Sequence, residues 1–429
     1  DHCELWINPL NPEELLLGND GGLYQSYDGG KHWLHLNNIP TGEFYDIEIN
    51  NQIPYTIYGG TQDDATVFGP NKERNPKLDD PWQYLWIDAW SGGDGCITLV
   101  DPTDNNTVYF SMQNGNARRL DLKKKKSISI RPRFSGEYQL NINYNFITPY
   151  LLDPHNSSTV LMAGNYVLES VDKGRSWKPI SSDLVAEAGK YGEMAAGALA
   201  VSPLDKNVIY MGTDKGTFWV TKNRGITWEN KSDGLSSQYI RSIYPSKYKN
   251  GRVYMQMTGM NYDNLNAYLY VSEDHGTTWK SIESNLPNHP INSILEDPFY
   301  EEILYAGTFR GVYISMNRGR KWTYLGAGLP DTSIADVEID VASKDLVIAT
   351  HGRGIYKTNL LPFYHCFNEK QASNSLFEPR PVNAPMLRDT HRDVDEASLE
   401  KVTISFWMEQ IEDVELHVKK DETVIWSKK

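Results

Sequence analysis

One motif recurs five times in this chain of 429 residues and constrains the fold more than any other feature. It consists of a Ser or Thr, an Asp or Asn two positions later, a Gly two positions after that, and a Trp three positions further on. The copies cover residues 26–33, 170–177, 221–228, 272–279 and 315–322. Self-similarity at intervals of roughly 20 to 50 residues is typical of solenoids, propellers and related arrays. The chain is therefore interpreted as a repeat protein.

Each motif ends a longer phrase: an apolar strand before a D-P or S-P turn, a second strand before a Gly-rich turn, and a third strand that runs into the motif. The clearest phrase covers 199–203, 208–213 and 218–221. First strands of this kind begin near Leu5, Phe44, Ile97, Ile147, Ala198, Ile240, Ile291 and Ile334, which makes eight copies. The second and third copies lack the motif.

Short strands at this spacing, with almost no helical periodicity between them, are typical of four-stranded antiparallel blades. The predicted fold is therefore all-β: a β-propeller of about eight blade-like repeats, either seven- or eight-bladed or part of a larger or tandem propeller. The last copy, over 345–356, stops after its third strand. We expect its fourth strand to come from elsewhere, because an unpaired strand edge leaves backbone groups unsatisfied.

The repeat ends near residue 360, and this boundary divides the chain into three predicted parts. Residues 1–360 form the propeller. Residues 361–398 are polar, contain prolines and show no period, so they are interpreted as a linker. Residues 399–429 alternate between apolar and polar like sandwich strands, and we expect them to be the start of an immunoglobulin-like β-sandwich that is truncated here.

Composition excludes several classes of function. The formal net charge of −14 and the pI of about 5.2 disfavour nucleic acids and anionic membranes as partners. No apolar run approaches the roughly 18 residues of a transmembrane helix. Three well-separated cysteines and no residues at metal-ligand spacing give no reason to expect a metal or another cofactor.

The recurring motif has a structural interpretation. At a turn between two strands, the short Asp or Asn side chain hydrogen-bonds the backbone of the turn, and the Gly adopts a conformation that other residues resist. The Trp supplies a large apolar surface for burial. We assign this structural role to Asp28, Trp33, Asp172, Trp177, Asn223, Trp228, Asp274, Trp279, Asn317 and Trp322.

The Gly-rich turns between second and third strands lie on the opposite face from the motifs, together with the connections from one blade to the next. Charged side chains gather in these turns, and a concave rim with convergent polar groups is the default place for a ligand. Two carboxylates there could hydrolyse a glycosidic bond, with Asp94, Asp63 and Asp20 as the catalytic candidates. The ligand-binding candidates are Asp64, Arg118, Asp214, Arg310, His351 and Arg353. For each of them, a purely structural role in its turn is the alternative.

The motifs resemble the Asp-box, or bacterial neuraminidase repeat, of sialidases, sortilin-type receptors and xyloglucanase-type glycoside hydrolases. A closer resemblance, to large secreted and mostly bacterial sortilin-like or glycosyl-hydrolase-like repeat propellers, is carried by residues 1–2, 5–9, 18–22, 54–55, 58–60, 62–63, 92–95 and 349–354. This resemblance implies a secreted or cell-envelope location. Sialidases have an R-I-P motif and an arginine triad, and neither can be assembled from this sequence.

The resulting functional prediction is a binding or scaffold module. Many structural motifs and no complete catalytic signature favour a propeller that binds a polysaccharide or protein partner through the rim of Gly-rich turns, as part of a larger envelope assembly. The alternative is a glycoside hydrolase that uses an Asp pair on that rim. Two carboxylates separated by about 5 to 5.5 Å or about 6.5 to 9.5 Å in an open cleft, one with a raised pKa, would favour the enzyme.

Overall fold

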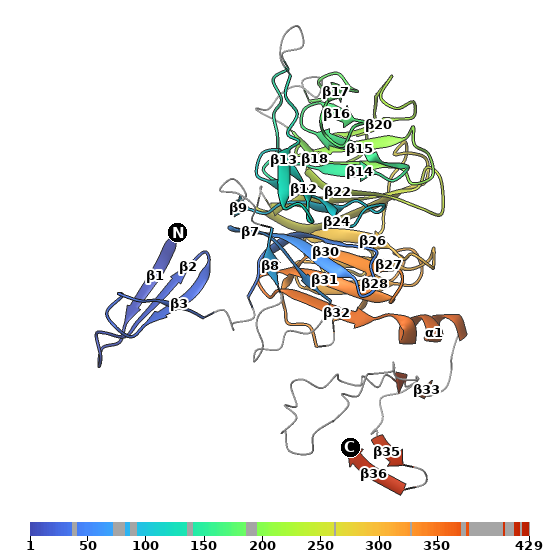
Figure 1. The fold of residues 1–429 in the computed structure, drawn as a ribbon. Coiled ribbons are helices and arrows are strands. Elements are labelled where there is room, and N and C mark those ends of the chain that lie inside the picture. Colours follow the sequence, from blue (N-terminus) through green and yellow to red (C-terminus); the bar gives the residue numbers. More distant parts are fainter. Residues whose placement is uncertain are drawn as a thin grey trace. The chain divides into compact units, whose positions relative to one another are not determined.

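The computed structural model describes residues 1–36, 41–71, 82–85, 92–134, 140–185, 195–260, 263–326, 328–369, 375–376, 406–407, 416–420 and 423–428. Nearly all of the regular structure is β, in small sheets whose strands pair in chain order, as expected for a β-propeller (Figure 1). The chain divides into two compact units, the second of which consists mainly of the chain from Thr358 onward.

Seven sheets make up the propeller ring, and six of them contain four consecutive antiparallel strands. The first three are β5 (Phe44–Ile49), β6 (Thr56–Thr61), β7 (Asp64–Pro70) and β8 (Gln83–Tyr84); β10 (Thr98–Val100), β11 (Thr107–Met112), β12 (Asn116–Asp121) and β13 (Lys126–Ser129); and β14 (Tyr150–Asp153), β15 (Asn156–Ala163), β16 (Val167–Ser170) and β17 (Lys178–Pro179). The short strand β9 (Gly93–Asp94) adds to the first of these sheets by pairing parallel with β7.

The remaining four sheets continue the same order. They are β18 (Ala196–Val201), β19 (Ile209–Thr213), β20 (Phe218–Thr221) and β21 (Glu229–Asn230); β22 (Tyr239–Pro245), β23 (Val253–Gly259), β24 (Asn264–Ser272) and β25 (Lys280–Ser281); β26 (Ile291–Glu296), β27 (Leu304–Thr308), β28 (Gly311–Ser315) and β29 (Thr323–Tyr324); and β30 (Ser333–Asp340), β31 (Asp345–His351) and β32 (Ile355–Asn359). Within the described residues, no fourth strand joins β32.

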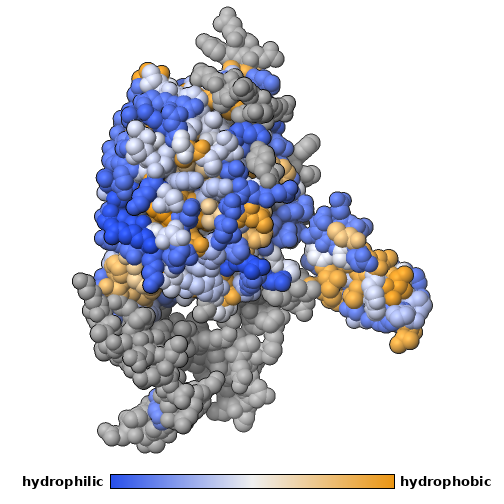
Figure 2. Space-filling model, turned by 180° about the vertical axis from the view of Figure 1, so that it is seen from behind, coloured by the Kyte–Doolittle hydropathy of each residue, from blue (hydrophilic) through white to orange (hydrophobic). Residues whose placement is uncertain are grey.

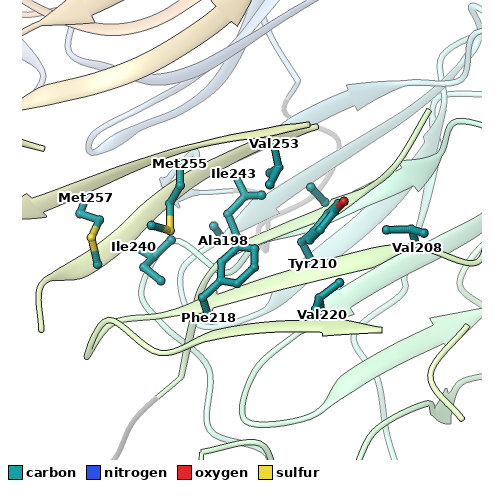
Figure 3. Packing of buried hydrophobic residues seen from close by; sticks show 11 residues of the cluster. Ala198, Val208, Tyr210, Phe218, Val220, Ile240, Ile243, Val253, Met255 and Met257 are labelled. Carbon is teal, nitrogen blue, oxygen red and sulfur yellow. The ribbon is translucent and has the colours of Figure 1, made fainter. Parts of the chain in front are cut away.

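Buried side chains between neighbouring sheets hold the ring together. Figure 3 shows one such layer, in which Phe218 and Tyr210 of one sheet pack against Ile240 and Met255 of the next. A similar cluster joins Ala335 and the rest of the last sheet to Phe44 of the first, and this contact closes the ring. Because both faces of each sheet are covered, β19 and β27 are buried at every position rather than at alternate ones.

The innermost strands share a β-bulge near their first residues. Pairing skips one residue in each of β5, β18, β22 and β26, and the skipped residues are Tyr45, Gly197, Arg241 and Asn292. A bulge frees its extra residue from the ladder and turns its side chain in a new direction. The side chains of Tyr45 and Arg241 therefore do not follow the alternation of side chains between the two faces of the sheet.

The five sequence motifs lie at turns between third and fourth strands, where the Asp or Asn side chain accepts a hydrogen bond from its own turn. In the four motifs of the ring, the Trp indole also donates to the preceding blade. In one copy, Asp172 accepts hydrogen bonds from the Ser176 backbone and hydroxyl at 2.9 and 2.6 Å, which lowers the pKa of its carboxyl. The indole of Trp177 donates to the carbonyl of Ile130 in the preceding sheet at 2.9 Å, and Trp228 donates in the same way to Ile180.

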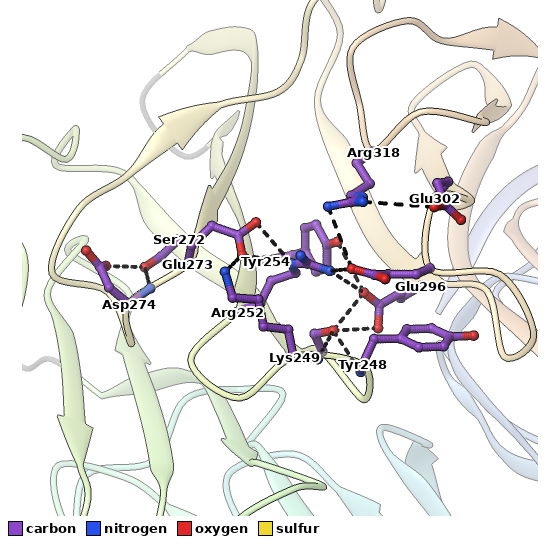
Figure 4. Close-up of polar contacts among 12 residues, drawn as sticks. Tyr248, Lys249, Arg252, Tyr254, Ser272, Glu273, Asp274, Glu296, Glu302 and Arg318 are labelled. Atoms are coloured by element: carbon purple, nitrogen blue, oxygen red, sulfur yellow. Dashed lines mark hydrogen bonds and ion pairs between the residues drawn. The ribbon is translucent and has the colours of Figure 1, made fainter.

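Ion pairs add to the contact between sheets. The residue before the motif Gly has a positive φ, and Arg224 at this position reaches back to Asp153 and Glu169 in the preceding sheet. Figure 4 shows another group, in which buried Arg252 donates to Glu273 at 3.0 Å and to Glu301 at 2.7 Å. Each cation is shared by at least two carboxylates, so little charge is left uncompensated in the interface.

A separate N-terminal sheet contains β1 (His2–Ile7), β2 (Leu15–Asn19), β3 (Gly22–Ser26) and β4 (Leu34–His35). It has the strand order of the ring sheets, but every residue of β1 is exposed, including Leu5, Trp6 and Ile7. Apolar side chains accordingly gather on its surface (Figure 2). The eight predicted repeats are thus seven ring sheets and this one.

The second unit lies in the part of the chain interpreted as a linker and a partial sandwich. It contains the helix α1 (Leu361–Glu369), which the sequence interpretation did not anticipate. Two short hairpins follow, β33 (Ser375–Leu376) with β34 (Phe406–Trp407) and β35 (Leu416–Lys420) with β36 (Thr423–Lys428). Most of residues 370–429 lie outside the described ranges, so the proposed division at 398 stays a prediction.

Candidate functional site

The glycine-turn face, defined here by the turns between second and third strands together with the connections between sheets, carries the candidate site. Its central feature is the pairing of β9 with the start of β7, which sets Asp94 beside the turn that contains Asp63. This pairing needs glycine, because a Cβ at Gly60 would collide with the Cys96 carbonyl and one at Gly95 with the Ala65 carbonyl.

Two of the predicted catalytic residues meet there. Asp94 is only 6% exposed and accepts hydrogen bonds from Tyr45 Oη at 3.0 Å and from Gln113 Nε2 at 2.9 Å. Asp63 is exposed and has a φ of 56°. Desolvation and the Asp94 charge raise the pKa of Asp63. The two carboxyl groups therefore interact electrostatically.

His351 joins this group through Tyr45. The two ring centroids are 5.6 Å apart, and His351 Nδ1 lies 3.2 Å from the carbonyl oxygen of Phe44. His351 also forms a β-bridge with Glu43, which precedes the first inner strand. We call Tyr45, Asp63, Asp94, Gln113 and His351 the mouth cluster.

Four further acidic residues lie on the two adjacent inner strands that close the ring. Asp46 and Glu48 belong to β5, and Asp336 and Glu338 belong to β30. Desolvation and the mutual proximity of the carboxylates raise the pKa of Asp46, Glu48 and Glu338 well above their ordinary values. Desolvation raises that of Asp336 to about 6, and Arg241 acts in the opposite direction. None of the four was singled out from the sequence.

A pocket of about 360 Å³ lies on the same face. It is lined by Asn114, Arg131, Ile142, Asn143, Tyr144, Asn145, Phe146, Ala195 and Asp214. Only Asp214 among these residues was a predicted site residue; desolvation raises the pKa of its carboxyl, and its Oδ1 is buried without a hydrogen-bond partner. The amide nitrogen of Asn114, next to Gln113, donates to the Phe146 carbonyl at 3.0 Å, so the pocket adjoins the mouth cluster.

The other predicted residues make most of their contacts within their own turns or sheets, but the Asp20 charge also contributes to the raised pKa of Asp63. Asp20 lies in the N-terminal sheet, where the amine of Asp1 donates to it at 2.6 Å and lowers the pKa of its carboxyl. Arg118 donates to Ser127 Oγ on the fourth strand of its own sheet at 2.7 Å.

Three rim candidates remain in their own turns. Half-buried Asp64 follows Asp63 at the start of β7, and desolvation and the Asp63 charge raise the pKa of its carboxyl. Arg310 and its partner Asp331, at 3.9 Å, are both largely exposed. Arg353 lies exposed in the turn between β31 and β32.

Sequence reasoning missed the residues that link these groups. Tyr45 lies at the bulge of its strand, and Tyr144 and Phe146 belong to an Asn- and aromatic-rich segment in a connection between sheets. The Asn- and aromatic-rich composition is a signal from which this segment could have been recognised in the sequence. The acidic strands also carry one, because D-I-E-I at 46–49 and D-V-E-I at 336–339 repeat the same alternation.

The described residues give no support for a metal centre or a membrane span. Across them, no group of three His, Cys, Asp or Glu side chains could hold a metal ion. No helix in the described part of the chain is long and apolar enough to cross a lipid bilayer.

Comparison with known proteins supports the fold and little beyond it. No family model matches the chain, and no curated protein matches it. YCF48 from Cyanidioschyzon merolae is a structural match at 10% identity with a TM-score of 0.41, covering 83% of this chain and 94% of that one.

A second structural match has a higher TM-score. It is the extracellular domain of the putative hybrid two-component system BT3049 from B. thetaiotaomicron, at 13% identity and a TM-score of 0.51 over 73% of this chain and 39% of that one. The chain thus spans about two-fifths of that protein. By fold, the chain is a β-propeller protein, and its Asp-box and sortilin-like character stays a prediction from the sequence.

Proposed function

We propose that this protein is a secreted or cell-envelope binding module that engages a polysaccharide or protein partner through the glycine-turn face. The observation that carries the proposal is the convergence of the mouth cluster and the adjoining pocket on one face. Both consist of side chains from separate repeats that the ring brings together. Propellers commonly bind partners at such an end of the ring, and a rim of polar groups around a concavity is the usual form of a ligand site.

The extracellular setting has two sources of support. The resemblance in sequence is to secreted repeat propellers, and the solved structure with the higher TM-score is described as an extracellular domain. The acidic net charge of −14 is also that of a protein kept away from nucleic acids and anionic lipids. We therefore expect the partner to be encountered outside the cytoplasm.

The geometry of the acidic pair argues against the alternative of a glycoside hydrolase. In retaining and inverting enzymes the two carboxyl groups stand about 5 to 9.5 Å apart, because the glycosidic bond or a water must fit between them. Asp94 does not face such an open gap: it is only 6% exposed, and its two carboxylate oxygens already accept hydrogen bonds from Tyr45 and Gln113. A raised pKa at Asp63 is the one enzymatic criterion that the pair meets.

The test compares variants on the two faces of the ring. The probes are a polysaccharide microarray and a displayed peptide library, applied to wild type, Asp63→Asn, His351→Ala and the control Arg175→Ala, whose side chain is exposed at a motif turn. We expect at least one probe to bind and the two mouth variants to weaken it by about tenfold or more, with the control unchanged. Binding that both mouth variants retain in full would refute the proposal.

A parallel screen addresses hydrolysis. Wild type, Asp63→Asn and Asp94→Asn are incubated with the polysaccharides of the array, and reducing ends are measured. We expect no release above buffer for any of the three. Release by wild type that either substitution abolishes would establish the hydrolase instead.

A further inference from the structure

We infer that the pocket beside the mouth cluster is a subsite for a neutral saccharide. This inference rests on the proposed binding function and deepens it, because it selects the chemical class of the partner. It is carried by the pocket walls, which combine an exposed aromatic ring with planar polar side chains. Sugars present the matching surfaces: apolar C–H faces that stack on rings, and vicinal hydroxyls that both donate and accept hydrogen bonds.

The pocket wall formed by residues 142–146 is held from both sides. The Asn143 backbone amide donates to Asn165 Oδ1 at 2.9 Å, and the Phe146 carbonyl accepts from the Asn114 backbone amide at 3.0 Å. Thr148 Oγ1 donates to the Asn145 carbonyl at 2.7 Å. The segment is a connection between sheets with no regular structure, yet its backbone is fixed before any ligand arrives, which reduces the entropy lost on binding.

Two aromatic residues of the wall have different roles. Tyr144 packs one side of its ring against Gly115, where a Cβ would meet the ring at 2.9 Å, and the Arg131 guanidinium lies 5.5 Å from the ring centroid. Tyr144 is therefore a supporting wall. Phe146 is 45% exposed, and a large apolar ring left open beside polar groups is a stacking surface for the apolar face of a sugar.

The polar groups of the pocket are incompletely satisfied. Asp214 Oδ1 and the Tyr144 hydroxyl are buried without a hydrogen-bond partner. The Asn114 side chain is exposed in the β11–β12 turn, and its backbone amide is fixed by a hydrogen bond to the Phe146 carbonyl. One carboxylate oxygen of Asp214 lacks a hydrogen-bond donor, so its charge is poorly compensated. A hydrogen bond from a ligand hydroxyl to this carboxylate would therefore contribute more binding free energy than the same bond in water.

Charge and shape favour a neutral saccharide over other ligands. Asp214, Asp63, Asp94 and the acidic inner strands repel an anionic glycan, and Arg131 is already engaged with Asn116 Oδ1 at 2.9 Å. A peptide that adds to a sheet requires an exposed strand edge, whereas none of the lining residues lies in a strand. The volume of about 360 Å³ lies at the lower end for small-molecule sites and suits a short saccharide.

The experiment uses the full chain and an array of neutral oligosaccharides (cello-, xylo-, manno-, malto- and chito-series), with hits measured by calorimetry. The pocket variants are Phe146→Ala, Asp214→Asn and Asn114→Ala. Phe309→Ala is the matched control, since this phenylalanine is 41% exposed in the β27–β28 turn of the same face. We expect wild type to bind at least one series, and Phe146→Ala and Asp214→Asn each to weaken it by about tenfold.

Each outcome decides the inference. Loss in the pocket variants, with the melting temperature and the binding of Phe309→Ala unchanged, supports it. Binding that the pocket variants retain overturns it, and if His351→Ala or Asp63→Asn abolishes that binding the proposed function survives. Failure of every neutral oligosaccharide to bind also overturns the inference. A peptide ligand whose binding depends on the mouth cluster would then support the proposed function. If no probe binds at all, both the inference and the proposed function are refuted.

Discussion

Asp336→Asn should change stability in a way that depends on pH. The carboxyl lies among four acids on adjacent inner strands, and desolvation raises its pKa from an ordinary value of 3.8 to about 6. The difference, about 2, corresponds to about 3 kcal/mol. The folded state holds the proton more tightly than the unfolded chain does. The carboxyl therefore leaves the free energy of unfolding unchanged below pH 3.8 and lowers it by the full amount above pH 6. Asparagine removes that penalty.

The substitution also has a cost that does not depend on pH. Asp336 accepts a hydrogen bond on Oδ1 from its neighbour Val337 at 2.8 Å and one on Oδ2 from Ile47 at 3.3 Å. An asparagine amide can keep one acceptor only, so one bond worth about 1 kcal/mol is lost. The expected net effect is a stabilisation of about 2 kcal/mol near pH 7.5 and no stabilisation near pH 4.5, where about 1 kcal/mol of penalty and the lost bond cancel.

Urea unfolding of wild type and variant at both pH values measures this difference. The control is Asp331→Asn, whose side chain is 69% exposed and which should change the free energy of unfolding by less than about 0.5 kcal/mol at either pH. An Asp336→Asn effect of the same sign and size at both pH values would refute the reasoning, because it would mean that the folded state does not perturb this carboxyl.

Three further predictions concern the interior of the ring. Arg224→Ala leaves buried Asp153 without its cation and should destabilise by about 3 to 5 kcal/mol in urea unfolding, whereas Lys222→Ala, which removes an exposed pair, should cost less than about 1 kcal/mol. Trp322→Phe removes an indole that is 2% exposed and donates to a carbonyl at 2.8 Å; thermal melting should report a loss of about 2 kcal/mol. The pKa of the Cys96 thiol is raised to about 12 by burial, so with the other cysteines changed to serine it should react with a disulfide reagent only after urea is added; prompt reaction in the folded state would contradict this.

The blades were predictable because the sequence of each repeat contains the signals for its own strands and turns. A Gly-rich turn, a third strand and a motif recur in one order, and the structure follows that order with the motif turns between third and fourth strands. The sheet count was also within reach of the sequence. The sequence could not show that the repeat at β1 to β4 stands outside the closed ring of seven. Closure depends on the contact between Ala335 and Phe44, which are about two-thirds of the chain apart in sequence.

The candidate site was predictable only where single turns carry it. Asp63, Asp94 and His351 were named from their Gly-rich turns and do meet, but the link between them is Tyr45, which a bulge turns out of its strand. The pocket depends on residues 142–146, a connection without period, and on a turn two sheets away. Irregular backbone carries no periodic signal, so its three-dimensional partners cannot be inferred from spacing.

The two faces of the ring differ in how freely their residues can change. On the motif face, Asp172, Trp177 and their counterparts in other repeats use their polar groups to hold their own turns and the preceding sheet. A change there costs stability, so that face is constrained to repeat itself. On the glycine-turn face, the groups that meet come from different repeats and no two turns are alike. Asp214 and Tyr144 retain buried polar atoms without a hydrogen-bond partner there. Surfaces of this kind carry recognition because stability does not dictate them, which is why the binding experiments concentrate on this face.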